Sequence, residues 1–350
     1  MIRLNSSWRT LRRRLAGPVM EAALRLRAGP CTRGLLPKNL VVLAYHRIDD
    51  PRRPGFYGFS GNVSATRQAF SEQLDLLAEQ YTVVGIDDVV AWRRGLIDLP
   101  RNPVLITFDD GYRDNFTDAL PELAARRLPA VLFVCTGYVD GTVYFWWDWV
   151  ADVFARTKLR QAVLPLLGNW AWENAEERSR LAALWVNVAK RLPQMTLRYC
   201  LRELAATIGE EIPERGPSQA RLTWDELKVM TEQGFMVGAH TVRHPNVNRI
   251  SEERARKEIA TSRAIIEQRL GISVDSFAYP YGGKDDFNER HERILEQEGF
   301  ALGFRLDGGI TFAREVRRRP FAVRRVCITQ KDTLPRFAAK VAGASRFASL

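Results

Sequence analysis

Two neighbouring carboxylates, Asp109 and Asp110, stand between an apolar run and Gly111. The run, Val104–Phe108, has the composition of a short buried strand. Two acids at the end of such a strand each need a charged partner or a metal ion, because burying a lone carboxylate is costly. Gly111 permits a tight turn that would direct both acids into one cavity. The alternative is ordinary turn chemistry between a strand and a helix.

Two of the four histidines provide the second group of chemical interest. His240 and His244 follow another apolar stretch, Phe235–Ala239, and Pro245 comes directly after them. Imidazole is a common metal ligand, and one carboxylate with two imidazoles is a usual catalytic zinc set. Because proline prevents a regular helix from continuing through this point, the spacing indicates a loop that wraps a metal ion.

These segments resemble the motifs of the polysaccharide deacetylase family, the NodB-homology enzymes of carbohydrate esterase family four. Thr107–Gly111 is similar to the first motif of the family, His240–Pro245 to the second, and Phe277–Gly282 to the third. The resemblance extends over roughly residues 40 to 330, apart from an insertion. Three motifs in this order at strand ends are a specific pattern, whereas any one alone would be weak.

The resemblance implies a role in the active site for each of these residues. Asp110, His240 and His244 would bind a divalent metal, Asp109 would be the general base, and the backbone N–H of Tyr281 would stabilise the oxyanion. Three protein ligands leave an open position for water, whose pKa the metal lowers while it polarises the acetyl carbonyl. A carboxylate that is not bound to the metal can take the proton of that water. Zinc (Zn²⁺) suits the ligand set best, and nickel, cobalt or ferrous iron would also fit.

The activity implied by the resemblance is metal-dependent hydrolysis of N-acetyl groups on amino sugars. The substrate would be an oligo- or polysaccharide, with a lipid-linked glycan as one version, and the products would be a free amine and acetate. The partner of the protein would therefore be an N-acetylated glycan. The sequence does not identify the sugar, its linkage or the oligomeric state.

Two features of the family pattern are missing. The third motif often carries an arginine that tethers the base, and Ala278 stands at that position. Arg324 and Arg325 on the last expected strand are candidates to replace it, with a surface ion pair as the alternative. The late segment that supplies the general acid also has no match. We hypothesise that His46, at the end of the first expected strand, contributes to protonation or substrate binding, whereas His291 is expected to be exposed in a polar helix.

These departures keep a second function class open, a catalytically inactive carbohydrate-binding protein on the same fold. The intact acids and histidines oppose it. A third class is a membrane-associated scaffold in which the basic ends of the chain matter more than the cavity.

The elements that must position these residues alternate between strand and helix patterns, which predicts an α/β fold. Strands are expected at 40–45, 81–84, 104–108, 130–135, 235–239, 276–279, 301–304 and 322–329, and helices at 66–80, 86–94, 114–127, 223 onward, 251–270 and 287–298. Together they indicate an irregular parallel (β/α) barrel of about 7–8 strands, with functional residues at the C-terminal ends of strands. The barrel is expected to comprise residues 39–139 and 221–330.

Residues 140–220 interrupt this alternation with helical, charged sequence, so they are expected to form a helical insertion. Six of the nine tryptophans lie between Trp146 and Trp185. Trp146, Trp147 and Trp149 could stack on sugar faces. The alternative is that the tryptophans form the core of a small helical unit, because tryptophan mainly supplies buried area.

The net charge of +11 is concentrated at the two ends of the chain. Residues 1–30 hold seven arginines against Glu21, and residues 317–350 hold nine lysines and arginines against Asp332, so the body is nearly neutral. We expect a basic N-terminal extension at 1–38 and a basic C-terminal tail at 331–350. Basic ends attract anionic partners such as a membrane surface, and solvated termini are the alternative. No nucleic-acid motif is recognisable, so that partner is discounted.

The sequence shows no stretch apolar enough to be a transmembrane helix. Leu15–Met20, the longest uncharged piece of the basic start, is too short for the apolar region of a signal peptide. The expected location is the cytoplasm, with peripheral contact at the inner membrane face through the basic ends as one version of it.

Overall fold

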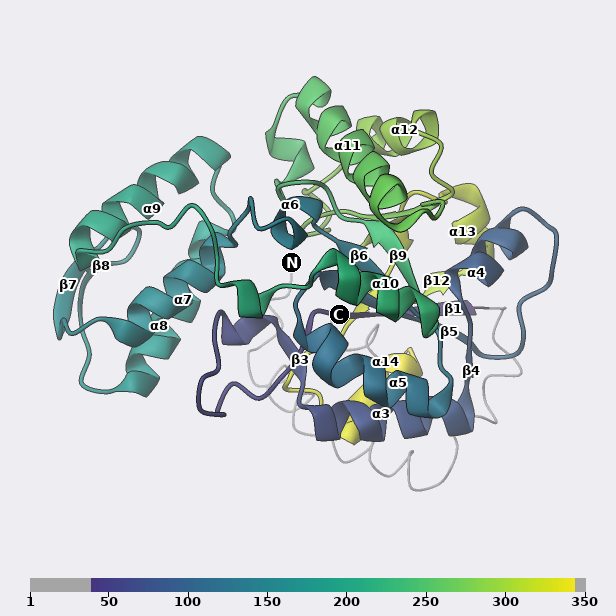
Figure 1. Ribbon diagram of the computed structural model, residues 1–350, viewed down its shortest axis with the longest axis horizontal. Helices are drawn as coiled ribbons and strands as arrows, with labels where there is room; N and C mark the ends of the chain where they lie inside the picture. The colour runs from purple at the N-terminus through teal and green to yellow at the C-terminus, as the bar shows by residue number, and fades with distance from the viewer. Residues whose placement is uncertain (1–38, 344–350) are drawn as a thin grey trace, which may run out of the picture.

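The apolar runs of the sequence form the strands of a nearly closed barrel in the computed structural model, which describes residues 39–343 (Figure 1). The barrel has eight mostly parallel strands, and only the pairing of β12 with β1 is antiparallel. Their order is β12 (Thr311–Phe312), β1 (Asn39–Tyr45), β5 (Pro103–Asp110), β6 (Ala130–Val134), β9 (Phe235–Ala239), β10 (Ser276–Ala278), β11 (Leu302–Arg305) and β13 (Val323–Arg324). A further strand, β14 (Val326–Cys327), pairs with β1 and brings the end of the sheet back to its beginning. The expected fold class is confirmed.

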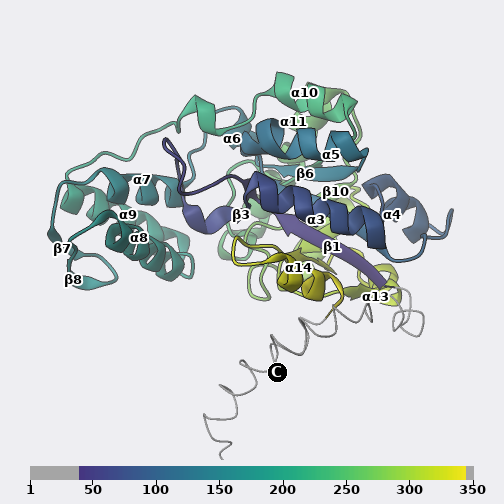
Figure 2. The same ribbon diagram turned by 90° about the horizontal axis from the view of Figure 1, so that it is seen from below.

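Helices surround the barrel, as Figures 1 and 2 show. They are α3 (Arg67–Gln80), α4 (Ile86–Arg93), α5 (Leu120–Arg126), α10 (Trp224–Glu232), α11 (Glu252–Leu270), α12 (Glu289–Gln297), α13 (Ala313–Arg318) and α14 (Leu334–Val341). Their ends follow local chemistry. Thr223 and Glu226 form a capping box at α10, Ser251 caps α11, and Gly271 ends α11 with a left-handed backbone.

The register of the central strands brings the motif ends to one level of the barrel. Asp110 pairs with Val134, and Val134 pairs with Ala239, the residue before His240. Phe277 on β10 also pairs with Ala239. Because parallel strands end at the same edge of a sheet, the acids, the histidines and the third motif meet at one mouth of the barrel.

The insertion at 140–220 forms a lobe beside the barrel, on the left in Figure 1. It contains α7 (Trp146–Arg156), α8 (Ala175–Ala189) and α9 (Gln194–Ile208), together with an antiparallel hairpin of β7 (Gln161–Leu164) and β8 (Gly168–Ala171). The expectation of helices alone was therefore wrong for the hairpin. Its two strands have four residues each and are mostly exposed, so they carry too short an alternation of polar and apolar residues to be recognised.

The insertion has its own apolar core, to which its tryptophans contribute. Trp149 and Trp185 are fully buried, and the Trp149 indole donates a hydrogen bond to the Glu211 carbonyl. For these residues the core interpretation is confirmed. Trp147 is also buried, whereas Trp146 is half-buried.

The chain after β14 is not a solvated tail as far as it is described. Helix α14 buries Phe337 and Val341 and packs against α3, as the view from below shows (Figure 2). The Lys340 ammonium lies 2.6 Å from the Asp332 carboxylate. The apolar residues fall on one face of the helix, which explains why a basic segment folds onto the barrel. The expected N-terminal extension, 1–38, lies outside the described residues.

Among residues 39–343, no helix has both the length and the apolar character that crossing a bilayer requires.

Candidate active site and metal centre

Asp110, His240 and His244 meet at the barrel mouth. The Nε2 atoms of His240 and His244 lie 3.6 Å and 3.2 Å from Oδ1 of Asp110, and one ligand atom from each residue lies within 4.8 Å of the others. The Asp110 and His240 side chains are 2% exposed, and the His244 side chain is 8% exposed. The three residues that the sequence placed at two strand ends are thus brought together.

The ionisation of this cluster suits a cation. Burial raises the pKa of Asp110, but contacts with His240 and His244 outweigh it and hold that pKa well below its usual value. Burial lowers the pKa of His244, which favours the neutral imidazole. Neither carboxylate oxygen of Asp110 has a hydrogen-bond partner among the described residues. A buried, ionised carboxylate without donors, facing two imidazoles, is the donor set that a divalent metal satisfies.

The rings are oriented by their surroundings. Nδ1 of His240 donates a hydrogen bond of 2.7 Å to the Ala278 carbonyl, so its Nε2 lone pair faces Asp110. The ring of His244 makes T-shaped contacts with the rings of Trp147 and Tyr281. The distances between ring centres are 5.0 Å and 5.3 Å. Ala278, which stands where the family often has arginine, thus positions a ligand through its backbone.

Glu258 holds the loop that carries the histidines. This buried carboxylate on α11 accepts hydrogen bonds from the backbone N–H groups of Val242 (3.0 Å) and Arg243 (2.8 Å). Sequence reasoning missed this residue, because a glutamate within a charged helix gives no signal of its own.

Backbone strain accumulates at the same place. Asp110, Thr241, His244 and Tyr281 have φ angles of 81°, 67°, 53° and 63°. Residues other than glycine rarely adopt this left-handed region, and each such residue costs about 1–3 kcal/mol. Their concentration at the cluster indicates a site whose geometry is imposed by the surrounding fold.

Asp109 is held by Arg325 rather than by the candidate metal ligands. Two guanidinium nitrogens of Arg325 donate to the two Asp109 oxygens at 2.6 and 2.7 Å, and Arg325 is fully buried. Burial raises the pKa of Asp109, but the charge and hydrogen bonds of Arg325 bring it below its ordinary value. Of the two candidate arginines, Arg325 is the one that contacts the acid. It occupies the break between β13 and β14.

His46 lies at the same barrel mouth, directly after β1. Its backbone N–H donates to Ser64 Oγ at 2.9 Å, and its carbonyl accepts from Asn115 at 2.8 Å. Burial lowers its pKa, while the charges of Asp110 and Asp109 act in the opposite direction. The location therefore agrees with the hypothesis, and its role stays a prediction.

His291, in contrast, is not exposed. Its Nδ1 accepts from the Asn288 backbone N–H, and its Nε2 donates to the Val247 carbonyl, so it caps α12 from within the protein. The polar sequence of the helix concealed this buried position.

Tyr281 is half-buried behind Pro280. Burial raises the pKa of its hydroxyl to about 12, with Trp146 as a neighbour that acts against the shift. No hydrogen bond found among residues 39–343 uses its backbone N–H, so this donor is free to face a ligand.

The insertion contributes directly to the wall of the site. Asp148 on α7 accepts hydrogen bonds from the Tyr112 hydroxyl (2.8 Å) and the Phe59 backbone N–H (2.7 Å). The Trp147 indole donates to the same Tyr112 hydroxyl at 3.0 Å. Because Tyr112 follows the first motif, these bonds tie the lobe to the acids of the barrel.

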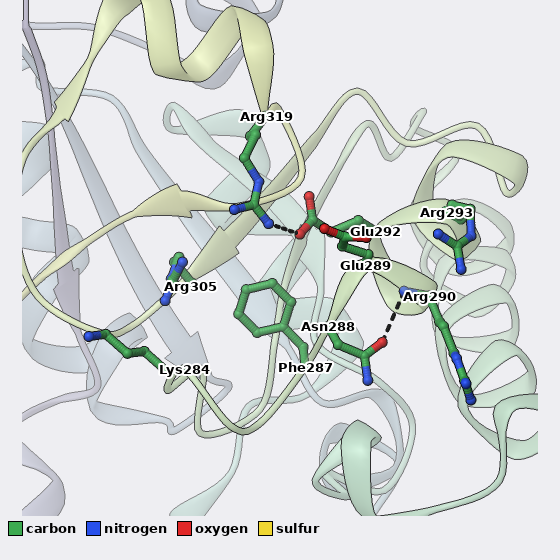
Figure 3. Close-up of a pocket in the computed structure, with 9 residues that line it drawn as sticks. All are labelled: Lys284, Phe287, Asn288, Glu289, Arg290, Glu292, Arg293, Arg305 and Arg319. Carbon is green, nitrogen blue, oxygen red and sulfur yellow. Dashed lines mark hydrogen bonds and ion pairs between the residues drawn. The ribbon is translucent and has the colours of Figure 1, made fainter.

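A separate surface pocket of about 520 Å³ lies at the start of α12 (Figure 3). Its basic lining includes Lys284, Arg305 and Arg319, but Arg305 pairs with Asp307 and Arg319 pairs with Glu292. None of the motif residues lines it, so it is not the candidate site.

Similarity to a known protein extends over most of this chain. The poly-beta-1,6-N-acetyl-D-glucosamine N-deacetylase of Escherichia coli K12 is 23% identical over 309 residues, which are 87% of this chain and 39% of that protein. The chain thus spans about two fifths of the curated relative's length.

Solved structures share the fold. The deacetylase PplD of Streptococcus pyogenes, in complex with acetate, has a TM-score of 0.58 at 17% identity, covering 87% of this chain and 99% of that one. IcaB from Ammonifex degensii has a TM-score of 0.53 at 22% identity, covering 87% and 97%.

The model of the family described as polysaccharide deacetylase matches residues 97–303. The match runs from the approach to β5 into β11 and includes the two acids, the two histidines and Tyr281. Because it covers more than half of the sequence, the chain belongs to the polysaccharide deacetylase family.

Proposed function

We propose that this protein removes N-acetyl groups from amino sugars in an oligo- or polysaccharide, with a divalent metal held by Asp110, His240 and His244. The observation that carries the proposal is the pair of adjacent carboxylates with different partners. Asp110 faces two imidazoles and has no donor, whereas Asp109 is fixed by Arg325. One acid is therefore available to a metal and the other to a proton.

The metal would act as a Lewis acid and would lower the pKa of a water molecule, so that this water could lose its proton near neutral pH. Asp109 would accept the proton of the attacking water, because its carboxylate is ionised and its orientation is fixed by the two Arg325 bonds. The Tyr281 N–H would donate to the oxygen that becomes negative during attack on the acetyl carbon.

Cleavage of the C–N bond then requires a proton on the leaving nitrogen. The proton taken up by Asp109 balances this step, and His46, which interacts electrostatically with Asp110 and Asp109, would be a second proton donor. Acetate and a free sugar amine are the products. We include the role of His46 in the proposal because the described site offers no other histidine that is free of the metal cluster.

The relative from Escherichia coli is named for a polymer of N-acetyl-D-glucosamine linked β-1,6. We propose N-acetylglucosamine polymers as the substrate class of this chain too. The missing arginine tether was one argument for the alternative, an inactive sugar-binding protein. Because Arg325 pairs with Asp109, this argument no longer supports that alternative.

The test is acetate release from N-acetylglucosamine oligomers, measured with the metal content of the same sample. Asp109→Asn should reduce the rate by at least a factor of about 100 while the bound metal is retained. Asp75→Asn, the same change at an exposed acid on α3, is the control. Metal-loaded protein that releases no acetate, or equal rates for Asp109→Asn and the wild type, would refute the proposal.

A further inference from the structure

The insertion brings a lysine to the active site. Lys190 caps the C-terminal end of α8 and is half-buried. Its ammonium nitrogen lies 5.2 Å from the ring centre of Phe59 and 5.8 Å from that of Trp147. Trp147 in turn lies 5.0 Å from the ring of His244, measured between ring centres. The ammonium is therefore one aromatic ring away from a candidate metal ligand.

The charge of Lys190 acts on the site residues. Burial lowers the pKa of Lys190, and the two carboxylates that act most strongly in the opposite direction are Asp110 and Asp148. Lys190 also lowers the pKa of His46. These interactions agree with the position of the ammonium beside Phe59 of the barrel segment and Trp147 of the insertion.

The Lys190 ammonium has no ionic or hydrogen-bonding partner of its own in the part of the chain that is described. Neighbouring cations do: Arg325 pairs with Asp109, and Arg47 pairs with Asp49 and Asp114. The two aromatic faces give the ammonium a cation–π environment, which leaves its three N–H donors unused. The donors of this half-buried ammonium are therefore available to oxygen atoms of a ligand.

The backbone at Lys190 is fixed relative to the histidine loop. A guanidinium nitrogen of Arg249 donates to the carbonyls of Leu192 at 2.6 Å and Lys190 at 3.3 Å. Arg249 ends a short 3-10 helix, Val247–Arg249, that follows the second motif. The lobe therefore presents Lys190 at a defined position rather than on a free arm.

We propose that Lys190 contacts the substrate: its ammonium donates hydrogen bonds to oxygen atoms of the bound sugar and repels a sugar that carries a free, protonated amine. The inference rests on the proposed deacetylase function and adds a specificity to it. Flanked by Phe59 and Trp147, the ammonium would favour neutral N-acetylated units at this position. Deacetylated units would bind poorly, because like charges in a partly desolvated site repel each other.

The test compares Lys190→Met with Lys190→Arg, and uses Lys158→Met, an exposed lysine of the same insertion, as the control. In Lys190→Met the KM for N-acetylglucosamine oligomers should rise about tenfold, with a smaller change in kcat, because a hydrogen bond to a charged donor is lost. Inhibition by fully deacetylated glucosamine oligomers should become several-fold stronger and less dependent on salt. Lys190→Arg should remain close to the wild type, and Lys158→Met should not differ from it.

Two outcomes overturn the inference alone. One is a wild-type enzyme that releases acetate while Lys190→Met keeps the same KM and the same inhibition by glucosamine oligomers. The other is an equal loss of activity and melting temperature in Lys190→Met and Lys190→Arg, which would show a structural role. A wild type that fails to release acetate overturns the proposed function and this inference with it.

Discussion

The ion pair between Arg325 and Asp109 allows a prediction whose size follows from burial. Both side chains are almost completely buried, at 0% and 3% exposed, and two hydrogen bonds join them. Arg325→Met leaves a similar apolar stem but no charge, so Asp109 would remain buried without compensation. Breaking a buried pair in this way costs about 3–5 kcal/mol. The free energy of unfolding at neutral pH should fall by that amount.

The sign of the pH dependence follows from the pKa of Asp109. In the folded wild type this pKa is lowered, so the pair stabilises the fold above the unfolded value of about 4. That stability is lost as the pH falls through the folded value. The difference between wild type and Arg325→Met should therefore be largest at neutral pH and shrink towards pH 3.

Activity should follow the same logic. Without Arg325, burial raises the pKa of Asp109, so less of the base is ionised near neutral pH. The acid limb of the pH–rate profile for acetate release should move to higher pH. Arg325→Lys keeps the charge but loses the two-pronged geometry, so it should give an intermediate result.

The assay is urea unfolding at pH 3 and pH 7, combined with the pH–rate profile. Arg324→Met is the matched control, because this neighbouring arginine is half-buried and has no acid pair among the described residues. Equal unfolding midpoints for the Arg324 and Arg325 variants, with an unchanged profile, would refute the reasoning.

Three further predictions concern the Asp110, His240 and His244 cluster, the histidine loop and the insertion. Zinc should raise the melting temperature of chelator-treated wild type, by a stabilisation of about 2.7 kcal/mol when zinc is at 100 times its Kd. Asp110→Ala should abolish this rise, and an unchanged rise would mean that zinc binds elsewhere. Glu258→Gln should weaken zinc about 10–100-fold in a competition titration, because the loop loses its carboxylate support, and wild-type affinity would count against this. Burial raises the pKa of Asp148 to about 6, so the folded state holds this proton more tightly than the unfolded state does. The free energy of unfolding should therefore fall as the pH rises from about 4 to about 6. Asp148→Asn should remove on the order of 2 kcal/mol of this loss of stability. Urea midpoints of the variant that decline over the same pH range as those of the wild type would contradict this prediction.

The sequence could predict the part of the site that lies at the ends of regular strands. Asp110 and His240 could be placed together because each follows an apolar run, and parallel neighbours end at the same edge. The helix ends were equally accessible, since Thr223 with Glu226 and Ser251 with Gly271 are local signals. Such features need no knowledge of distant contacts.

The choice between Arg324 and Arg325 was beyond local reasoning. The two residues are adjacent, and alternation along a strand only says that they point to opposite sides. Which side faces Asp109 depends on β13 pairing with β11 while β14 pairs with β1, with Arg325 at the break. That break is a property of the closing barrel, so the decisive contact appears only when both ends of the sheet are in place.

Lys190 and Glu258 show the same limit for residues on helices. Each lies in a charged helical sequence where a solvated face is the default interpretation. Only the folded structure reveals that the Lys190 ammonium lies over Trp147 and that the Glu258 carboxylate binds the histidine loop. The insertion had been separated from the barrel on composition, yet Asp148 and Trp147 join it to Tyr112, directly after the first motif.

The strained residues explain why local rules fail at the centre of this molecule. Asp110, Thr241, His244 and Tyr281 adopt a backbone conformation that their side chains disfavour, so tertiary contacts must hold them there. Those contacts are visible: Glu258 binds two N–H groups of the histidine loop, and Gly137 donates to the Val242 carbonyl at a place where a Cβ atom would lie 2.5 Å from that oxygen. The free energy stored in the four residues is offset by packing elsewhere in the barrel. A cluster held in this way is preorganised, which is what a hydrolytic site requires of its scaffold.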